Sequence, residues 1–327
     1  MERPGGGKVL VVGATHGNER NAAWLIEAWR RRPGLLRRSG LEVELVIGNP
    51  AAHACGRRYV ERDLNRSFDP LLLADPARRE LEVDRARELL GRHGPASASP
   101  CLVALDLHST TAAMGNCLVV YGRRPTDLAL AAGLQRELGL PVYLHEDDPS
   151  QRGFLVERWP CGVVVEVGPV PQGVVQAQIC RQTTLAAEAA LAVLAAARRG
   201  TLRLPHHLLV HRHLGSLDLP RHDDGSPAAV VHPARQHRDW HPIRSGDPLF
   251  LDAEGATINY APPSGLAEEE VWAVFVNEAA YGEKGIALSL TRRERWTVEA
   301  AWSSALAELA GRLQTDGDQP QASVACS

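Results

Sequence analysis

The segment that decides the fold is residues 8–19, which read KVLVVGATHGNE. Its first part, Lys8–Val12, is a nearly continuous aliphatic run and predicts a strand buried on both faces, as in the centre of a parallel sheet. Gly13 ends this strand, a polar loop follows, and a helical pattern begins at Asn21. The loop therefore lies at the carboxyl edge of a sheet, where open α/β sheets hold their ligands.

The alternation of strand and helix continues to residue 202. Apolar runs predict further strands at 41–47, 101–105, 117–121 and 163–167, and periods near 3.6 predict helices at 71–93, 126–138 and 175–199. Strands that alternate with helices in this way predict an α/β fold with a mixed, largely parallel sheet over residues 1–202.

The character of the sequence changes after residue 202. Short strand-like pieces, separated by Gly, Pro and acidic residues, predict a smaller β-rich domain over residues 203–290. Residues 291–327 are predicted to form a C-terminal helix, from Arg292 to Leu313, followed by a polar tail.

The composition argues against several classes of function. The 327 residues carry 36 Lys and Arg against 39 Asp and Glu, so no strong positive field favours nucleic acid or an acidic membrane surface. The six cysteines form no C-x-x-C pair, and the N-terminus lacks the apolar stretch of a signal peptide. We therefore expect a cytoplasmic protein with reduced thiols. The sequence leaves open whether it is a monomer or a homo-oligomer.

Two loops at the predicted sheet edge carry residue types that bind metals. His16 and Glu19 form an H-x-x-E pattern in the first loop, and His108 follows the strand Cys101–Leu105. Two imidazoles and one carboxylate with an open fourth position make the ligand set of a catalytic zinc ion, and Asp106 lies close enough to orient one imidazole. The alternative is a surface histidine, a glutamate favoured by a helix dipole and a histidine after a strand. The two loops together favour the metal.

Two further features concern the chemistry around such an ion. Glu166 stands in the apolar run Val163–Val167, where a carboxylate is costly unless it is paired or functional, and where burial would raise its pKa toward a value useful for proton transfer. The alternative interpretation is that Glu166 has no catalytic role and only faces a polar crevice. Residues 57–68 carry four arginines that could hold an anionic substrate, although spacing alone favours a solvated stretch paired with its own acidic residues.

A histidine-rich segment follows the first domain and comprises His206, His207, His211 and His213. Alternation along a strand would divide these side chains between two faces. The sequence therefore disfavours a second metal site there.

Motifs spread in order over residues 8–285 resemble the aspartoacylase branch of the aspartoacylase and succinylglutamate desuccinylase family. They are G-A-T-H-G-N-E at 13–19, D-L-N-R at 63–66, D-L-H-S-T at 106–110, V-E-V-G-P at 165–169 and, in the second domain, F-V-N-E-A-A-Y at 275–281. Members of this family are zinc enzymes with a carboxypeptidase-like α/β domain and a smaller β domain that covers the active site. They hydrolyse the amide of N-acyl amino acids.

The resemblance implies roles for the matched residues of the first domain. His16, Glu19 and His108 are similar to the ligands of one Zn²⁺ per subunit. Glu166 is similar to the residue that activates the water at that ion. Arg58 is similar to the arginine that stabilises the tetrahedral oxyanion and contacts the substrate.

The resemblance also implies a substrate. Asn65 and Arg66 resemble the pair that grips the substrate carboxylate, and Tyr281 resembles a substrate-contacting tyrosine of the second domain. The implied reaction is hydrolysis of N-acetyl-L-aspartate to acetate and L-aspartate. The expected partner is thus a small N-acyl amino acid, with no nucleic acid and no membrane.

One departure concerns specificity. Animal aspartoacylases carry a further arginine for the side-chain carboxylate, and Arg152, Arg158 and Lys284 are the candidates to replace it here. N-acetyl aromatic amino acids and N-succinylglutamate therefore stay open as substrates. A non-catalytic protein of the same fold that binds acyl amino acids stays open as well.

Overall fold

The structure is a computed structural model that describes residues 6–146, 148, 151–266 and 269–315. The strand expected at residues 8–12 is β1 (Lys8–Gly13), which pairs in parallel with β2 (Val43–Ile47) and β3 (Cys101–Ser109). Val9 and Val11 pack into the core on one face of the sheet, and Leu10 and Val12 pack into the core on the other. Burial on both faces is why this strand is apolar at every position after Lys8.

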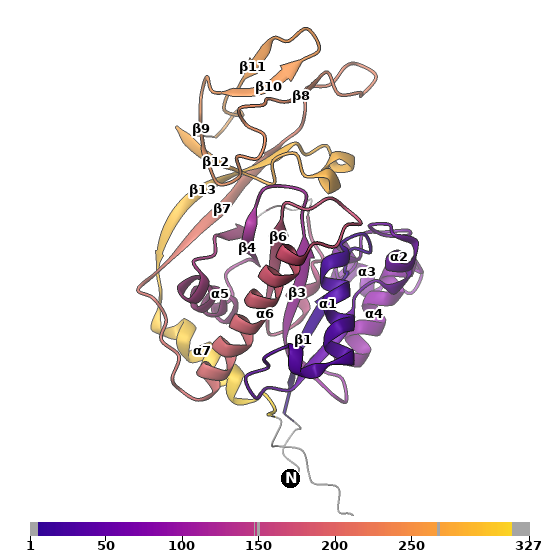
Figure 1. Ribbon diagram of the computed structural model, residues 1–327, viewed down its shortest axis with the longest axis vertical. Helices are drawn as coiled ribbons and strands as arrows, with labels where there is room; N and C mark the ends of the chain where they lie inside the picture. Colours follow the sequence, from indigo (N-terminus) through magenta and orange to yellow (C-terminus); the bar gives the residue numbers. More distant parts are fainter. Residues whose placement is uncertain (1–5, 147, 149–150, 267–268, 316–327) are drawn as a thin grey trace, which may run out of the picture.

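One sheet of ten strands runs through both parts of the molecule, in the order β2-β1-β3-β6-β4-β5-β7-β13-β12-β9 (Figure 1). Its other strands are β4 (Gly115–Tyr121), β5 (Val142–His145), β6 (Cys161–Gly168), β7 (His207–Leu217), β9 (Pro242–Arg244), β12 (Glu270–Val274) and β13 (Leu288–Thr297). β6 is parallel to β3 and antiparallel to β4, whereas β5 is parallel to β4 and β7. The expected mixed, largely parallel α/β sheet is confirmed.

The β-rich part lies at the far end of the molecule from β1 (Figure 1). It adds a separate three-stranded sheet of β8 (Ala229–Val231), β10 (Pro248–Asp252) and β11 (Thr257–Asn259). The long strands β7 and β13 pair antiparallel and connect this part to the first domain. The smaller β-rich domain predicted from the sequence is confirmed as a part of the fold.

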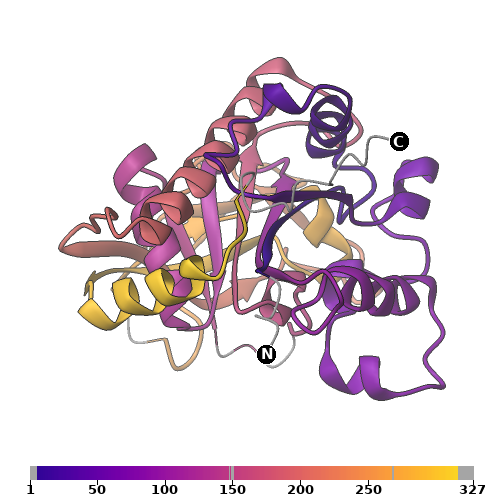
Figure 2. The same cartoon turned by 90° about the horizontal axis from the view of Figure 1, so that it is seen from below.

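Helices cover both faces of the main sheet (Figure 2). One layer contains α1 (Arg20–Arg31), α5 (Pro125–Leu138), α6 (Ala177–Arg198) and α7 (Ala300–Gly311). The other contains α4 (Leu81–His93) with the short turns η2 (Leu64–Arg66) and η3 (Leu155–Arg158). The remaining short helical elements are η1 (Pro33–Leu35), α2 (Pro50–Cys55), α3 (Pro70–Ala74) and η4 (Ala279–Lys284).

Two predictions of secondary structure were wrong. The single helix expected at 71–93 is divided into α3 and α4, because Pro76 lacks an amide proton and disfavours the helical conformation of the residue before it. The helix expected from Arg292 begins only at Ala300, because residues 288–297 pair with β7 as β13. The polar tail beyond residue 315 lies outside the described residues.

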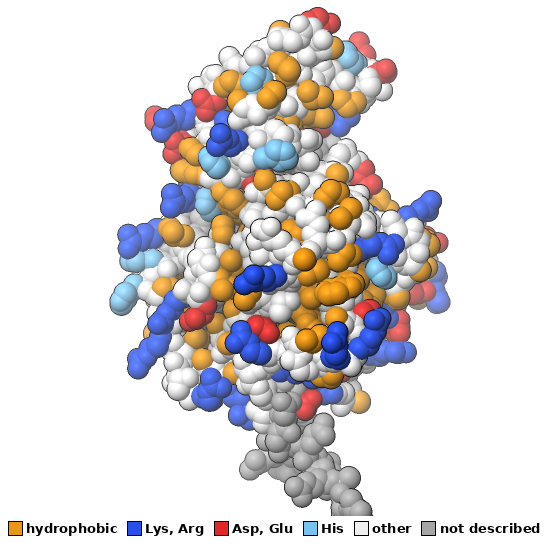
Figure 3. All heavy atoms as spheres, viewed as in Figure 1, with side chains coloured by type: hydrophobic (Ala, Val, Ile, Leu, Met, Phe, Trp, Pro, Cys, Tyr) orange, Lys and Arg blue, Asp and Glu red, His pale blue; other side chains and the backbone are white. Residues whose placement is uncertain are grey.

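One helix, α6, is long and apolar enough to cross a membrane by length and composition alone. This is weak evidence, because 56% of its most apolar window is buried inside the fold. Buried residues on α6, such as Ala187 and Leu191, belong to the core that also contains α1, α5 and α7. Figure 3 shows hydrophobic side chains gathered over the face formed by α1 and α6. Trp24 of α1 is 55% exposed.

Candidate active site

Three neighbouring parallel strands bring the predicted site together. His16 and Glu19 follow β1, His108 lies near the carboxyl end of β3, and Glu166 lies on β6 directly opposite His108 in register. All eight residues predicted for the site line one narrow cavity of about 30 Å³, namely His16, Glu19, Arg58, Asn65, Arg66, His108, Glu166 and Tyr281. The cavity combines elements that are distant in sequence, including η4 of the β-rich domain.

The metal-ligand residues form a compact buried group. His16 Nδ1 lies 2.6 Å from one carboxylate oxygen of Glu19, and His108 Nδ1 lies 2.9 Å from the other. The second contact lacks hydrogen-bond geometry, so within the described residues His108 Nδ1 is a buried atom without a hydrogen-bond partner. Two imidazole nitrogens and a carboxylate that converge in this way fit a divalent metal ion such as Zn²⁺.

Carboxylates behind the two imidazoles fix their orientation. His16 Nε2 lies 3.0 Å from Asp63 Oδ1, and His108 Nε2 lies 2.8 Å from Asp106 Oδ2. The Thr15 hydroxyl in turn donates to Asp106 at 2.6 Å. Each histidine thus holds its Nδ1 toward the site, which is what outer carboxylates do for metal-binding imidazoles. The sequence predicted this role for Asp106 but not for Asp63. Asp63 is the first residue of the D-L-N-R motif, and its place in that motif is the feature that could have indicated the role.

The electrostatics keep the group charged. Burial by itself raises the pKa of Glu19, but the charges of His108 and His16, with the hydrogen bond from His16, outweigh it and hold that pKa well below its usual value. Burial lowers the pKa of His108, yet Asp106 and Glu19 outweigh it and raise the pKa well above its usual value. Acidic side chains therefore surround both imidazoles, and a divalent cation that binds between them would replace the proton that His108 holds in the metal-free protein.

Glu166 has the properties of a proton acceptor. Burial raises its pKa to about 8, with a further increase from the charge of Glu19 that the nearby His108 opposes. Its Oε2 atom has no hydrogen-bond partner among the described residues. A carboxylate with a pKa near neutrality and an open oxygen is suited to take up and release a proton.

Arg58 is held beside the ligand group by two acidic side chains. Its Nη1 lies 3.4 Å from Glu19 Oε1 and its Nη2 lies 3.5 Å from Asp63 Oδ2. Its Nε is buried and lacks a partner in the described part of the chain. The guanidinium therefore has a fixed position and a donor still available for a substrate oxygen.

The residues expected to bind the substrate carboxylate are ordered by the segment before β6. The Leu155 amide donates to Asn65 Oδ1 at 2.8 Å. Arg66 lies over the Phe154 ring, 4.2 Å from its centroid, and donates to Gln151 Oε1 at 2.6 Å. These contacts orient Arg66 toward the cavity, because cation–π stacking restricts the plane of its guanidinium.

Tyr281 comes from η4 and packs against Phe275, with 5.3 Å between ring centroids. Burial, with the charge of Glu166 as a smaller cause, raises its pKa. Its hydroxyl is therefore a neutral donor. A neighbouring glutamate, Glu278, also lines the cavity but was not predicted.

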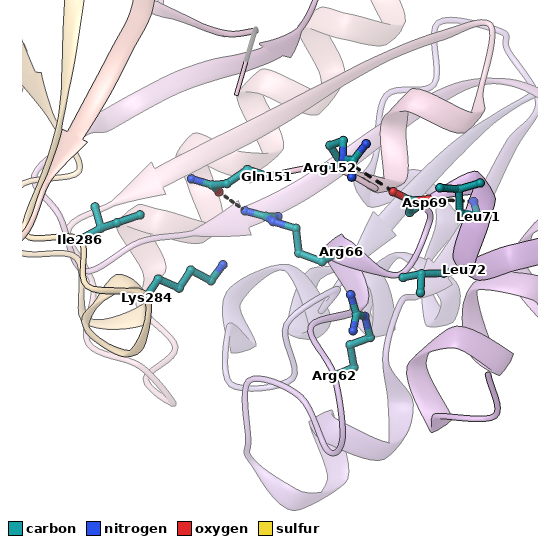
Figure 4. A pocket seen from close by; sticks show the side chains of 9 residues that line it. All are labelled: Arg62, Arg66, Asp69, Leu71, Leu72, Gln151, Arg152, Lys284 and Ile286. Atoms are coloured by element: carbon teal, nitrogen blue, oxygen red, sulfur yellow. Dashed lines mark hydrogen bonds and ion pairs between the residues drawn. The ribbon is translucent and has the colours of Figure 1, made fainter. Parts of the chain in front are cut away.

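A wider pocket of about 590 Å³ opens next to the narrow cavity, and Arg66 lines both (Figure 4). Its cationic side chains are Arg62, Arg66, Arg152 and Lys284. Lys284 also lies 3.4 Å from Asp63, whereas Arg152 is an exposed side chain 4.0 Å from Asp69. Arg158, the third candidate for the side-chain carboxylate, is exposed on η3 and does not line this pocket.

The fold and this site together define a class of mixed α/β proteins that have a smaller β-rich domain and a buried His-Glu-His group at the carboxyl edge of the sheet. Comparison with protein families gives the more particular identity. Residues 5–194 match the succinylglutamate desuccinylase/aspartoacylase catalytic domain, and residues 206–293 match the barrel-sandwich hybrid domain of the same family. The chain belongs to the aspartoacylase and succinylglutamate desuccinylase family.

Individual relatives agree with this assignment. The chain is 58% identical over 303 residues to a probable aspartoacylase of Parasynechococcus marenigrum, covering 93% of this chain and 98% of the relative. It is 52% identical to a probable aspartoacylase of Prochlorococcus marinus, covering 92% and 98%. Among solved structures, murine aminoacylase 3 superposes with a TM-score of 0.80 at 36% identity, covering 91% and 98%.

Proposed function

We propose that the protein is a zinc-dependent amidohydrolase that deacylates N-acyl amino acids, with N-acetyl-L-aspartate as its preferred substrate. The observation that carries this proposal is the convergence of His16, Glu19 and His108 beside Glu166 in one buried cavity. The names of the curated relatives support the aspartoacylase reaction. A cytoplasmic location belongs to the same proposal.

The zinc ion would be held by His16, Glu19 and His108, and it would supply Lewis-acid chemistry that acidifies water and polarises the acyl carbonyl. Glu166 accepts the proton of the attacking water and later delivers it to the leaving amine. The free donor of Arg58 faces the charge that develops on the acyl oxygen, where one donor contributes about 3–4 kcal/mol. The Ser109 amide donates to Glu19 at 3.0 Å. Because water is the attacking group in this mechanism, the Ser109 hydroxyl is not needed as a nucleophile.

The preference for an acidic amino acid rests on the charge of the adjoining pocket. Four cationic side chains line it, and Asp69 is the single acidic side chain among the lining residues that the structure describes. Arg66 and Asn65 bind the α-carboxylate, while Lys284 is placed to attract the side-chain carboxylate. Guanidinium and ammonium groups in a partly desolvated pocket favour a substrate with two carboxylates.

The test is a panel of N-acetylaspartate, an N-acetyl aromatic amino acid and N-succinylglutamate, assayed for amine release with metal content measured in parallel. We expect the highest kcat/KM for N-acetylaspartate, and loss of both zinc and turnover in His16→Ala. Preference for the aromatic substrate would replace the proposed specificity but keep the deacylase. Tight binding without turnover by zinc-loaded protein would instead support a non-catalytic binding protein.

A further inference from the structure

A second group of metal-ligand side chains lies outside the site described above. His145 ends β5, His213 lies on β7, and Asp148 follows β5. β5 and β7 are parallel neighbours that pair Tyr143 with His211, so this register places the two histidines side by side. Their rings stack with 4.9 Å between centroids. The histidines of residues 206–213 do not converge on one another; instead His213 meets partners from a different segment.

The distances within this group suit a shared ion better than direct bonds. His145 Nε2 lies 3.8 Å and His213 Nε2 lies 3.9 Å from the same oxygen of Asp148, Oδ2. Both distances exceed the hydrogen-bond range of roughly 2.7–3.2 Å. Two ligands of a tetrahedral ion with bonds of about 2.1 Å are roughly 3.4 Å apart, so a contraction of about half an ångström completes the geometry.

The surroundings of His145 and His213 favour the neutral form of both imidazoles. His145 is only 7% exposed, and its Nε2 has no hydrogen-bond partner among the residues that the structure describes. Tyr143 Oη lies 2.8 Å from His213 Nδ1, which leaves Nε2 of that ring to face the cluster. Burial lowers the pKa of His145 to about 3 and also lowers the pKa of His213. Neutral imidazole is the form that binds metals, and an outer-shell contact of this kind fixes its tautomer.

The group is reachable from solvent. His145 and Asp148 line a cavity of about 490 Å³ that also contains Gln151 and Arg152. An ion can therefore enter without unfolding of the core, as a metal site requires.

We propose that His145, Asp148 and His213 form a second metal site, distinct from the His16 group, that takes a divalent ion of the zinc or cobalt class. Imidazole and carboxylate ligands in this number select such ions over Ca²⁺ and Mg²⁺, which prefer oxygen ligands. The site binds its ion whether or not the deacylase proposal holds.

The ion anchors the segment that positions Arg66. The Gln151 amide donates to the Asp148 carbonyl at 3.1 Å, and the Gln151 side chain accepts from Arg66 (Figure 4). A metal that fixes Asp148 therefore fixes the partner of Arg66. Loss of the second site should therefore increase the KM for the acyl amino acid. This expected effect on Arg66 rests on the proposed function.

The test is a Co²⁺ titration of the full chain after removal of metals, followed by visible d–d absorption and by metal analysis after desalting. We expect two ions per chain in the unmodified protein and one in either His145→Asn or His16→Ala. His211→Asn is the matched control, since His211 is another buried histidine on β7 and contacts Thr291 instead; it should keep both ions. Tyr143→Phe should keep the stoichiometry and weaken the second ion by roughly 10–100-fold.

Two ions in His145→Asn would overturn the proposal. The proposal would also be overturned if the unmodified protein bound no ion, or if it bound a single ion that was lost in His16→Ala but kept in His145→Asn. A single ion lost in His145→Asn but kept in His16→Ala would support the second site and refute the proposed catalytic zinc. His213→Ala provides an independent variant, and melting curves of the metal-free proteins establish that each variant is folded.

Discussion

The Glu278 carboxylate of the β-rich domain accepts the Thr111 amide of the catalytic domain at 2.7 Å. The same oxygen also accepts the Thr111 hydroxyl at 2.9 Å, the Ala112 amide at 3.0 Å and the Thr110 hydroxyl. Glu278 is also the cap of η4, the element that carries Tyr281 and Lys284. One buried side chain therefore fixes the cover of the active site onto the loop that follows β3.

Removal of this contact should loosen the cover. Glu278→Ala leaves buried donors without an acceptor, which costs about 2–4 kcal/mol of unfolding free energy. It should also lower kcat/KM more than 10-fold, because Tyr281 loses its fixed position. Denaturant unfolding and steady-state kinetics measure the two effects. Glu283→Ala is the control on the same element, since the exposed Glu283 side chain bonds only the Tyr59 hydroxyl within the described part of the chain, and it should change stability by less than about 0.5 kcal/mol.

The arginines that line the wider pocket should differ in their contribution to substrate binding. Arg66 is held by Phe154 and Gln151, whereas Arg152 is exposed and only 4.0 Å from Asp69. A charged hydrogen bond contributes about 1.5–3 kcal/mol, so Arg66→Ala should lower kcat/KM roughly 10–150-fold, mainly through KM. Arg152→Ala should change it less than about threefold. Equal effects of the two variants would contradict the assignment of the carboxylate site to Arg66.

Much of the fold could be predicted because its central strands are buried on both faces. β1, β3 and β6 are mostly apolar, and their polar motif residues lie directly after β1 and in the carboxyl-terminal halves of β3 and β6. Parallel strands bring such ends together, so His16 and His108 could be placed at one edge from the sequence alone. Glu166 stood out for the related reason that a carboxylate is unusual in a buried strand.

The parts that could not be predicted depend on pairing between distant segments. Arg292–Thr297 has a helical composition but pairs with β7 as a strand, so tertiary contacts override local preference. Glu278 and the three residues His145, Asp148 and His213 acquire their neighbours only when the two domains and β5 with β7 are assembled. None of them stands in a local motif whose spacing indicates its partners.

The pH dependence of substrate binding should carry the signature of Lys284. Burial, together with the charge of Arg66, lowers its pKa to about 8, although Asp63 partly opposes this. The protonated amine attracts a carboxylate, so attraction is present below this pKa and is lost as the pH rises through it. We expect KM for N-acetylaspartate to rise above about pH 8. Lys284→Arg should abolish this rise, because guanidinium stays charged, and an unchanged profile in that variant would assign the titration to another group.

Glu166 offers the sharpest separation of metal binding from proton transfer. Glu166→Gln keeps the shape of the side chain but removes the group that accepts the proton, so kcat should fall by roughly 10²–10⁴-fold. Zinc content should stay the same, because Glu166 is not among the three ligand residues. In the pH–rate profile of the unmodified enzyme, activity should rise with pH as Glu166 loses its proton. The midpoint of this rise should lie below the Glu166 pKa of about 8, because a bound cation favours the ionised carboxylate. Metal analysis and pH–rate profiles of both proteins test this. Near-normal turnover of the zinc-loaded Glu166→Gln protein would mean that the water loses its proton to another base.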